Sequence, residues 1–169
     1  ISPDTSAAKI IDTLQNSQTS ASKDTANSQK SEDSLAILSK YGYFQPLTSG
    51  TEEIITINNK YSKIKISNKG AVVKSWTLNE YKNWYGGPTQ FINTKLGDLY
   101  ITFRTNQNNL IDTRDLYFAS DAQTQNFDLK DNDTIELSYV LRVDSSARII
   151  KKMRFYGNSY SFDQEIIVE

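Results

Sequence analysis

The feature that most constrains this chain is an alternation of apolar and polar side chains with a period of two residues. It is clearest between residues 135 and 143, where Glu136, Ser138 and Arg142 separate the apolar side chains. Successive side chains of a β-strand point to opposite faces, so this pattern predicts a half-buried antiparallel strand. The apolar positions of this segment are Ile135, Leu137, Tyr139, Leu141 and Val143.

The same alternation recurs from residue 46 to the last residue, and it predicts a series of short strands. A second clear run covers residues 160–168, and the shorter runs are 54–58, 63–67, 72–78, 99–104, 116–119, 127–130 and 147–156. Residues that favour tight turns separate these runs, at 68–70, 86–88, 131–133, 144–146 and 157–158. Short strands about every ten residues, joined by such turns, are typical of a β-sandwich or a barrel.

The N-terminal quarter of the chain has a different composition and predicts a different organisation. Residues 1–33 are rich in Ser, Thr, Asn, Gln, Asp, Lys and Ala and contain no aromatic residue, which predicts a disordered tether. Residues 34–45 are expected to form a short helix and a lead-in, with Gly42 at the end of the helix. The β-sandwich domain is then expected to cover residues 46–169 and to be incomplete at its C-terminus, because the last strand runs to Glu169.

Composition excludes several classes of function. The chain contains no cysteine and no histidine, so thiolate catalysis, disulfides and the commonest general base and metal ligand are all excluded. We therefore expect no enzyme activity, no cofactor and no metal. The net charge of −1 does not favour nucleic-acid binding, and alternation divides the basic residues Lys151, Lys152 and Arg154 between two faces of a strand.

Three aromatic residues, Tyr81, Trp84 and Tyr85, are the candidate contact residues for a partner or a ligand. They cluster in a polar, glycine-rich segment that does not resemble a central strand. Exposed aromatic rings on a loop can stack on sugars or anchor a protein partner. The alternative is a loop that folds its rings back onto the edge of the sandwich.

A pair of carboxylates, Asp163 and Glu165, lies two residues apart on one face of a predicted strand. Two carboxylates can catalyse glycoside hydrolysis, so a glycan-processing enzyme is a further alternative. The pair lies on the polar face of an amphipathic strand, however, which favours a solvated surface.

Three segments together resemble the first periplasmic domain of YidC membrane protein insertases, in the variety typical of Bacteroidetes-like bacteria. They are YGYFQPLTSGTEEIITINN at 41–59, KIKISNKGAVVKSWTLNEYKNWYGG at 63–87 and NLIDTRDLYFA at 109–119. The resemblance covers about residues 41–169. This chain has Gly70-Ala71 where the family pattern has two glycines, and Leu78-Asn79 where the pattern has Leu-Lys.

The resemblance implies an all-β fold, an antiparallel β-super-sandwich similar to that of galactose mutarotase, on the periplasmic face of the bacterial inner membrane. It also implies a non-catalytic accessory role in membrane protein insertion, through contacts with Sec translocon components and membrane-protein clients. No run of 18 apolar residues occurs, so the membrane anchors are expected outside this sequence. The alternative function is a periplasmic carbohydrate-binding module.

Overall fold

The computed structural model describes residues 35–169 of the chain. The chain divides into two units, residues 1–42 and residues 43–169. In the first unit, a helix covers residues 35–41 and ends at Gly42, whose φ of 53° is typical of a helix C-terminus. The predicted tether, residues 1–33, lies outside the described residues. No helix within residues 35–169 is both long and apolar enough to cross a bilayer.

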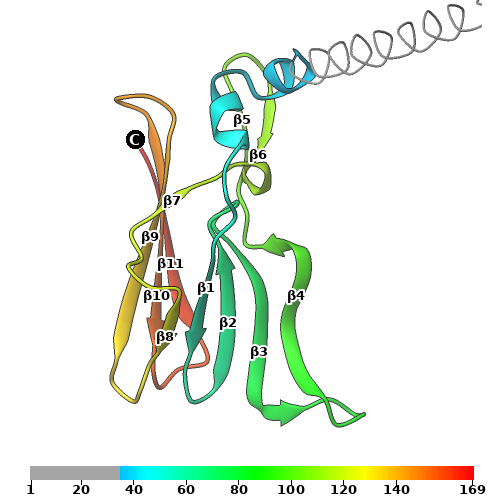
Figure 1. The fold of residues 1–169 in the computed structure, drawn as a ribbon, viewed down its shortest axis with the longest axis vertical. Helices are drawn as coiled ribbons and strands as arrows, with labels where there is room; N and C mark the ends of the chain where they lie inside the picture. The colour runs from blue at the N-terminus through cyan, green and yellow to red at the C-terminus, as the bar shows by residue number, and fades with distance from the viewer. Residues whose placement is uncertain (1–34) are drawn as a thin grey trace, which may run out of the picture. The chain divides into compact units, whose positions relative to one another are not determined.

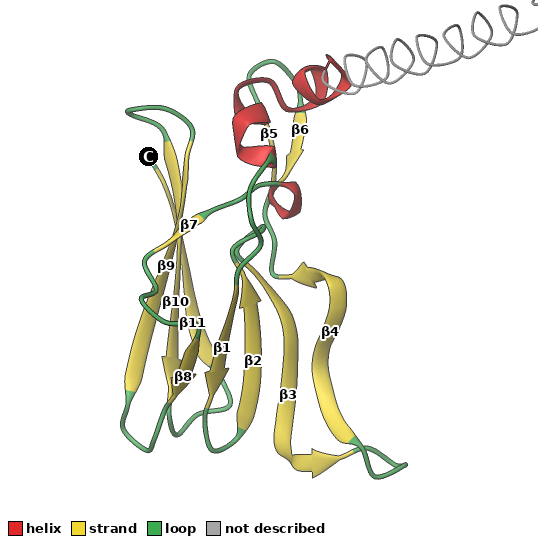
Figure 2. Ribbon diagram, in the orientation of Figure 1, coloured by secondary structure: helices red, strands yellow, loops and turns green. Residues whose placement is uncertain are grey.

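The second unit begins with a 3-10 helix, η1 (Gly42–Thr48), and continues into two β-sheets (Figures 1 and 2). The larger sheet has the strand order β4-β3-β2-β1-β8. Its strands are β1 (Ile54–Asn58), β2 (Ser62–Ser67), β3 (Val72–Lys82), β4 (Pro88–Asp98) and β8 (Asn126–Asp128). All neighbours in this sheet are antiparallel except β1 and β8, which pair in parallel.

The smaller sheet has the strand order β11-β10-β9-β7 and is antiparallel throughout. Its strands are β7 (Ala119–Ser120), β9 (Thr134–Arg142), β10 (Arg148–Tyr156) and β11 (Phe162–Val168). A separate two-stranded ribbon, β5 (Thr102–Arg104) and β6 (Leu110–Asp112), precedes a short 3-10 helix, η2 (Thr113–Asp115). In Figure 1 this ribbon lies beside η1, away from the β3–β4 turn.

The core lies on the inner faces of the two sheets. In β9 and β10, the alternate residues Leu137, Tyr139, Leu141, Met153 and Phe155 are buried, as the period-two pattern predicts. The larger sheet contributes Ile55, Ile57, Ile64 and Ile66 from β1 and β2. The sheets contact each other directly, since the rings of Trp76 in β3 and Phe162 in β11 have their centroids 5.3 Å apart.

One lysine belongs to this core. Lys151 of β10 is fully buried, whereas its neighbour Lys152 lies on the opposite, solvent-facing side of the strand. The Lys151 ammonium group donates hydrogen bonds to the carbonyl oxygen of Ala71, at 2.6 Å, and to that of Leu99. Burial lowers the pKa of Lys151 to about 8. This side chain therefore joins the smaller sheet to the β2–β3 turn and to the segment after β4.

The structure confirms the predicted all-β fold with a short helix, while the more specific super-sandwich assignment stays a prediction. Two strands were missed by the alternation, β4 and β6, and β3 extends four residues beyond the predicted end at Leu78. The pairing of β3 with β4 shifts register at three places. These shifts break the period of two along the strand, so β4 carries no readable alternation.

The predicted strand at residues 116–119 was largely wrong, because an irregular segment directly after η2 occupies residues 116–118. Asp112 caps η2 by accepting a hydrogen bond from the backbone N–H of Arg114 at 2.9 Å, and it also forms an ion pair with the Arg114 side chain. The backbone of Tyr117 then bonds to Leu47, and only Ala119–Ser120 pairs as β7.

Candidate interaction surface at the β3–β4 hairpin

The β3–β4 hairpin carries all three aromatic residues that the sequence singled out, but it places them in two different environments. Tyr81 belongs to β3, whereas Trp84 and Tyr85 lie in the turn between the strands. The turn closes through backbone hydrogen bonds from the Asn83 N–H to the Gly87 carbonyl and from the Gly86 N–H to the Asn83 carbonyl, and the Asn83 side chain accepts a further bond from the Gly87 N–H at 2.8 Å. The aromatic segment is thus a defined hairpin tip.

The two rings at the tip project away from the sheets. Trp84 is 94% exposed and Tyr85 is 70% exposed, so neither ring folds back onto the edge of the sandwich. Their rings meet edge to face, with centroids 5.1 Å apart and an interplanar angle of 89°. Gly86, which has a φ of 85°, lets the backbone reverse direction directly after them. The tip therefore presents two large amphipathic rings to its surroundings.

Tyr81, by contrast, belongs to an apolar groove of about 420 Å³ below the tip. The groove is lined by Leu78, Tyr81, Lys82, Thr89, Phe91 and Tyr160. Tyr160 arrives from the β10–β11 connection, and its ring centroid lies 6.2 Å from that of Tyr81 and 4.4 Å from that of Tyr61. The groove thus combines one hairpin of the larger sheet with one loop of the smaller sheet.

Hydrogen bonding and ring packing fix the walls of this groove. The Tyr160 hydroxyl donates to the Glu80 carboxylate at 2.9 Å, and loss of contact with water, together with this bond, raises the pKa of Tyr160. On the other wall, Phe91 packs edge to face on Trp76 at 5.7 Å, and Trp76 packs on Phe162 of the smaller sheet. Trp76 itself is half-buried. A continuous row of rings thus connects the groove to the core.

Sequence reasoning did not identify Phe91 and Tyr160 as members of this surface. Phe91 lies in the bulged strand β4, which the alternation did not reveal. Tyr160 is far from Tyr81 in the sequence, and only the pairing of β10 with β11 places it at the groove. Whether Tyr81, Trp84 and Tyr85 contact a partner remains a prediction.

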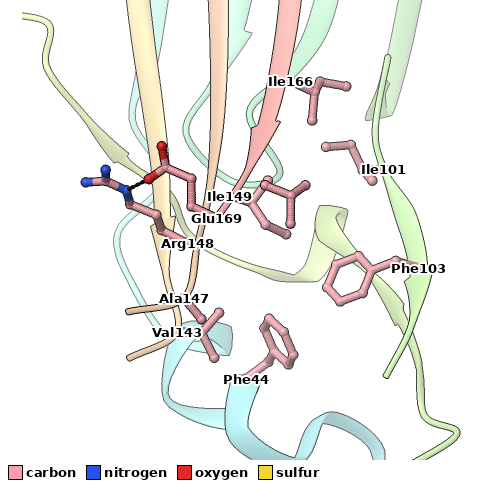
Figure 3. Close-up of a pocket in the computed structure, with 10 residues that line it drawn as sticks. Phe44, Ile101, Phe103, Val143, Ala147, Arg148, Ile149, Ile166 and Glu169 are labelled. Carbon is pink, nitrogen blue, oxygen red and sulfur yellow. Dashed lines mark hydrogen bonds and ion pairs between the residues drawn. The ribbon is translucent and has the colours of Figure 1, made fainter. Parts of the chain in front are cut away.

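A second apolar cleft, of about 290 Å³, lies at the other end of β11 (Figure 3). Its lining residues are Phe44, Ile101, Phe103, Val143, Ala147, Arg148, Ile149, Ile166, Val168 and Glu169. Phe44 and Phe103 pack edge to face with centroids 5.3 Å apart, and an ion pair joins Arg148 to Glu169 at the rim. This cleft contains few polar groups and carries no arrangement suited to chemistry.

The outer face of the smaller sheet holds the carboxylate pair that suggested glycan processing. Asp163 accepts a hydrogen bond from the hydroxyl of Tyr156, and Glu165 forms an ion pair with Lys152 at 3.9 Å. The hydrogen bond to Asp163 raises the pKa of Tyr156. Each carboxylate is thus engaged by a cross-strand neighbour on a charge-compensated face, and this does not favour paired acid–base chemistry. Within residues 35–169, no group of three or more acidic side chains is placed to hold a metal ion.

Comparison with known proteins identifies relatives of one kind. A sequence model of the family described as YidC periplasmic domain matches residues 54–169. The membrane protein insertase YidC of Chlorobaculum parvum is 35% identical over 126 residues, which cover 74% of this chain and 22% of that protein. The YidC of Chlorobium luteolum is 33% identical over 127 residues, which cover 75% of this chain and 22% of that protein.

A further YidC insertase, from Porphyromonas gingivalis, is 31% identical over 110 residues, which cover 62% of this chain and 18% of that protein. The chain therefore spans about a fifth of the length of the curated relatives that it matches.

Proposed function

The chain belongs to the YidC periplasmic domain family, and on this premise we propose that it is an accessory interaction domain of a membrane protein insertase. In this role it supports insertion and folding of inner-membrane proteins by holding partners on the periplasmic face of the inner membrane. The partners that we propose are Sec translocon components and membrane-protein clients. The mechanism is surface contact, without bond-making chemistry.

Family membership also places the chain outside the enzymes, because a periplasmic domain of an insertase is not a catalytic enzyme. The chain is a domain of the periplasmic face of the inner membrane for the same reason.

The observation that carries the proposal is the aromatic groove around Tyr81. Tyr81 and Phe91 are both exposed on the β3–β4 hairpin, and Tyr160 lines the groove from the β10–β11 connection. Interface hot spots are enriched in large aromatic side chains that fill or line such depressions. A rigid groove loses little conformational entropy when a partner side chain enters it, which favours contact over chemistry.

Site-specific photo-crosslinking in cells tests this proposal. A photoreactive phenylalanine analogue is placed at position 81 or 91 of the insertase that contains this chain, and at Tyr43 as the control. Tyr43 is an aromatic residue of η1 that is 76% exposed, so it reports background contacts. We expect adducts with translocon subunits or nascent membrane proteins at positions 81 and 91 above the Tyr43 background. Equal labelling at all three positions would contradict the proposal.

The aromatic lining of the groove also supports the carbohydrate-binding alternative, because sugars stack on such rings. Titration of the chain with soluble oligosaccharides separates the two functions, since Trp76 packs directly on Phe91 of the groove wall. A saturable change in tryptophan fluorescence would favour the carbohydrate-binding module. A flat titration together with position-specific crosslinks would favour the interaction domain.

A further inference from the structure

The β3–β4 hairpin differs in charge from the rest of the chain. Residues 81–97 contain two lysines, Lys82 and Lys95, and no aspartate or glutamate, although the whole chain has a net charge of −1. The same stretch contains a large share of the exposed apolar surface of the second unit. Its exposed large side chains are Tyr81, Trp84, Tyr85, Phe91 and Leu96. The hairpin is therefore a basic, aromatic arm on a domain that is otherwise slightly acidic.

The geometry of the tip suits a fluid surface better than a shaped partner. Trp84 is almost completely exposed, and it meets Tyr85 at 89°, so the two rings do not form a flat platform for a sugar. A protein partner would have to supply a deep pocket for two perpendicular rings. A bilayer needs no such complementarity, because its headgroup region accepts amphipathic rings of any relative orientation. Trp and Tyr are enriched at this depth in membrane proteins for that reason.

Charge complementarity indicates which kind of membrane surface the tip of the hairpin favours. A lysine near an anionic bilayer is attracted to its surface, and a nearby carboxylate would oppose that attraction. Lys82 precedes the turn by one residue, and the first carboxylate after the tip is Asp98, at the end of β4. Glu80, the preceding carboxylate, accepts the hydrogen bond from Tyr160 and belongs to the groove.

We propose that the tip of the β3–β4 hairpin is a membrane-surface contact, in which Trp84 and Tyr85 enter the headgroup region of an anionic bilayer beside Lys82. The contact orients the domain and sets the height of the Tyr81 groove above the membrane. Its two rings, Trp84 and Tyr85, are not part of the groove lining and only Lys82 is shared, so failure of the ring contact would leave the proposed partner contact untouched. Two rings and one lysine give weak affinity alone, but a membrane anchor raises the effective concentration to the millimolar range.

Fluorescence of the chain tethered to vesicles tests the proposal. The chain has two tryptophans and no histidine, so an N-terminal hexahistidine tag is its only strong ligand for a nickel-chelating lipid. In the Trp76→Phe variant, Trp84 alone reports on the tip; in the Trp84→Phe variant, Trp76 reports on the half-buried ring row. Vesicles contain phosphatidylglycerol or only phosphatidylcholine, with and without brominated acyl chains.

We expect Trp84 emission to shift to shorter wavelength and to be quenched by brominated lipid on the anionic vesicles, with a smaller effect on neutral vesicles and in the Lys82→Gln variant. Trp76 emission is expected to stay unchanged in the Trp84→Phe variant. If Trp76→Phe fails to fold, the difference between the unsubstituted chain and Trp84→Phe gives the same reading. An unchanged Trp84 signal, or an equal shift on neutral vesicles, would overturn the proposal.

Discussion

Replacing Lys151 by methionine perturbs the most unusual group in the core, an ammonium group with no exposed surface. Lys151 donates to the carbonyl oxygens of Ala71 and Leu99, two residues that both have positive φ, 47° and 63°. Methionine has a similar length and shape, but it cannot donate a hydrogen bond. The substitution therefore removes a buried charge and leaves the buried carbonyl group of Ala71 and the part-buried carbonyl group of Leu99 without this donor.

At neutral pH, removal of the buried charge stabilises the folded state, whereas loss of the hydrogen-bond donor destabilises it. Burial lowers the pKa of Lys151 from 10.5 to about 8, and this difference corresponds to a cost of about 3 kcal/mol for keeping the amine charged in the folded state. Two carbonyls that lose their donor cost about 1–3 kcal/mol each. We therefore expect Lys151→Met to lower the free energy of unfolding at pH 7 by a small net amount.

The dependence on pH is the sharper test. Below pH 8 the amine is protonated in both the folded and the unfolded state, so its contribution to stability is constant. Between pH 8 and pH 10.5 the unfolded state binds more protons than the folded state, so stability rises with pH, by up to about 3 kcal/mol. Burial also raises the pKa of Tyr139, the cross-strand neighbour of Lys151, and this lowers stability as pH rises past about 10, but the effect is common to both proteins and cancels from their difference.

Urea denaturation followed by circular dichroism between pH 7 and pH 10.5 measures this effect. The advantage of the unsubstituted chain over Lys151→Met is expected to grow by about 3 kcal/mol across that range. Lys152→Met is the control, because Lys152 is on the solvent-facing side of the same strand in an ion pair with Glu165. An advantage that stays constant from pH 7 to pH 10.5 would refute the assignment of Lys151 as a buried, strongly desolvated amine.

Three further substitutions test other parts of the fold. Gly97→Ala places a Cβ in steric overlap with a methyl carbon of Val72 at a φ of 85°, so we expect thermal denaturation to show a loss of about 3 kcal/mol or more in stability; a loss below about 1 kcal/mol would contradict this packing. Asn59→Ala removes hydrogen bonds to two backbone carbonyls of the β10–β11 connection, at 2.8 and 2.9 Å. We expect urea denaturation to show a loss of about 2–4 kcal/mol in the free energy of unfolding, and an unchanged midpoint would refute this. Arg154→Gln breaks the exposed ion pair with Glu136, and we expect calorimetry to show less than about 1 kcal/mol, vanishing at high salt; a larger, salt-independent loss would contradict its surface role.

The parts of the fold that the sequence predicts well are those with regular pairing. Strand β1 begins and ends at the predicted residues, and β9 and β10 follow the alternation closely because alternate residues of each are buried. Strand β11 lies where the alternation predicts it, but none of its residues is buried, and Ile166 and Val168 are exposed. The alternation fails at β4, where bulges shift the register, and at the three-residue strand β6, which is too short to show a period. The parallel pairing of β8 with β1 also carries no local signal, because it depends on a contact between distant segments.

The candidate site was predictable only in part, for a similar reason. Local composition identifies the aromatic segment with Tyr81, Trp84 and Tyr85, but the groove needs Tyr160 from the other sheet. The alternation correctly places Lys151 and Lys152 on opposite faces. It does not predict that Lys151 is buried, because a buried cation depends on carbonyl groups that two distant loops supply.

The measurement that tests the central claim most directly is affinity purification of the insertase that contains this chain, with Phe91→Asp in the groove. Leu110→Asp in β6 is the matched control, since Leu110 is also an exposed apolar residue on a strand. Removing the new carboxylate from water when a partner covers the groove costs free energy. We therefore expect the amount of co-purified translocon or client protein to fall about tenfold, equivalent to about 1.4 kcal/mol, while the control variant keeps the full amount. Equal recovery with both variants would contradict the account of this chain as an interaction domain that acts through its aromatic groove.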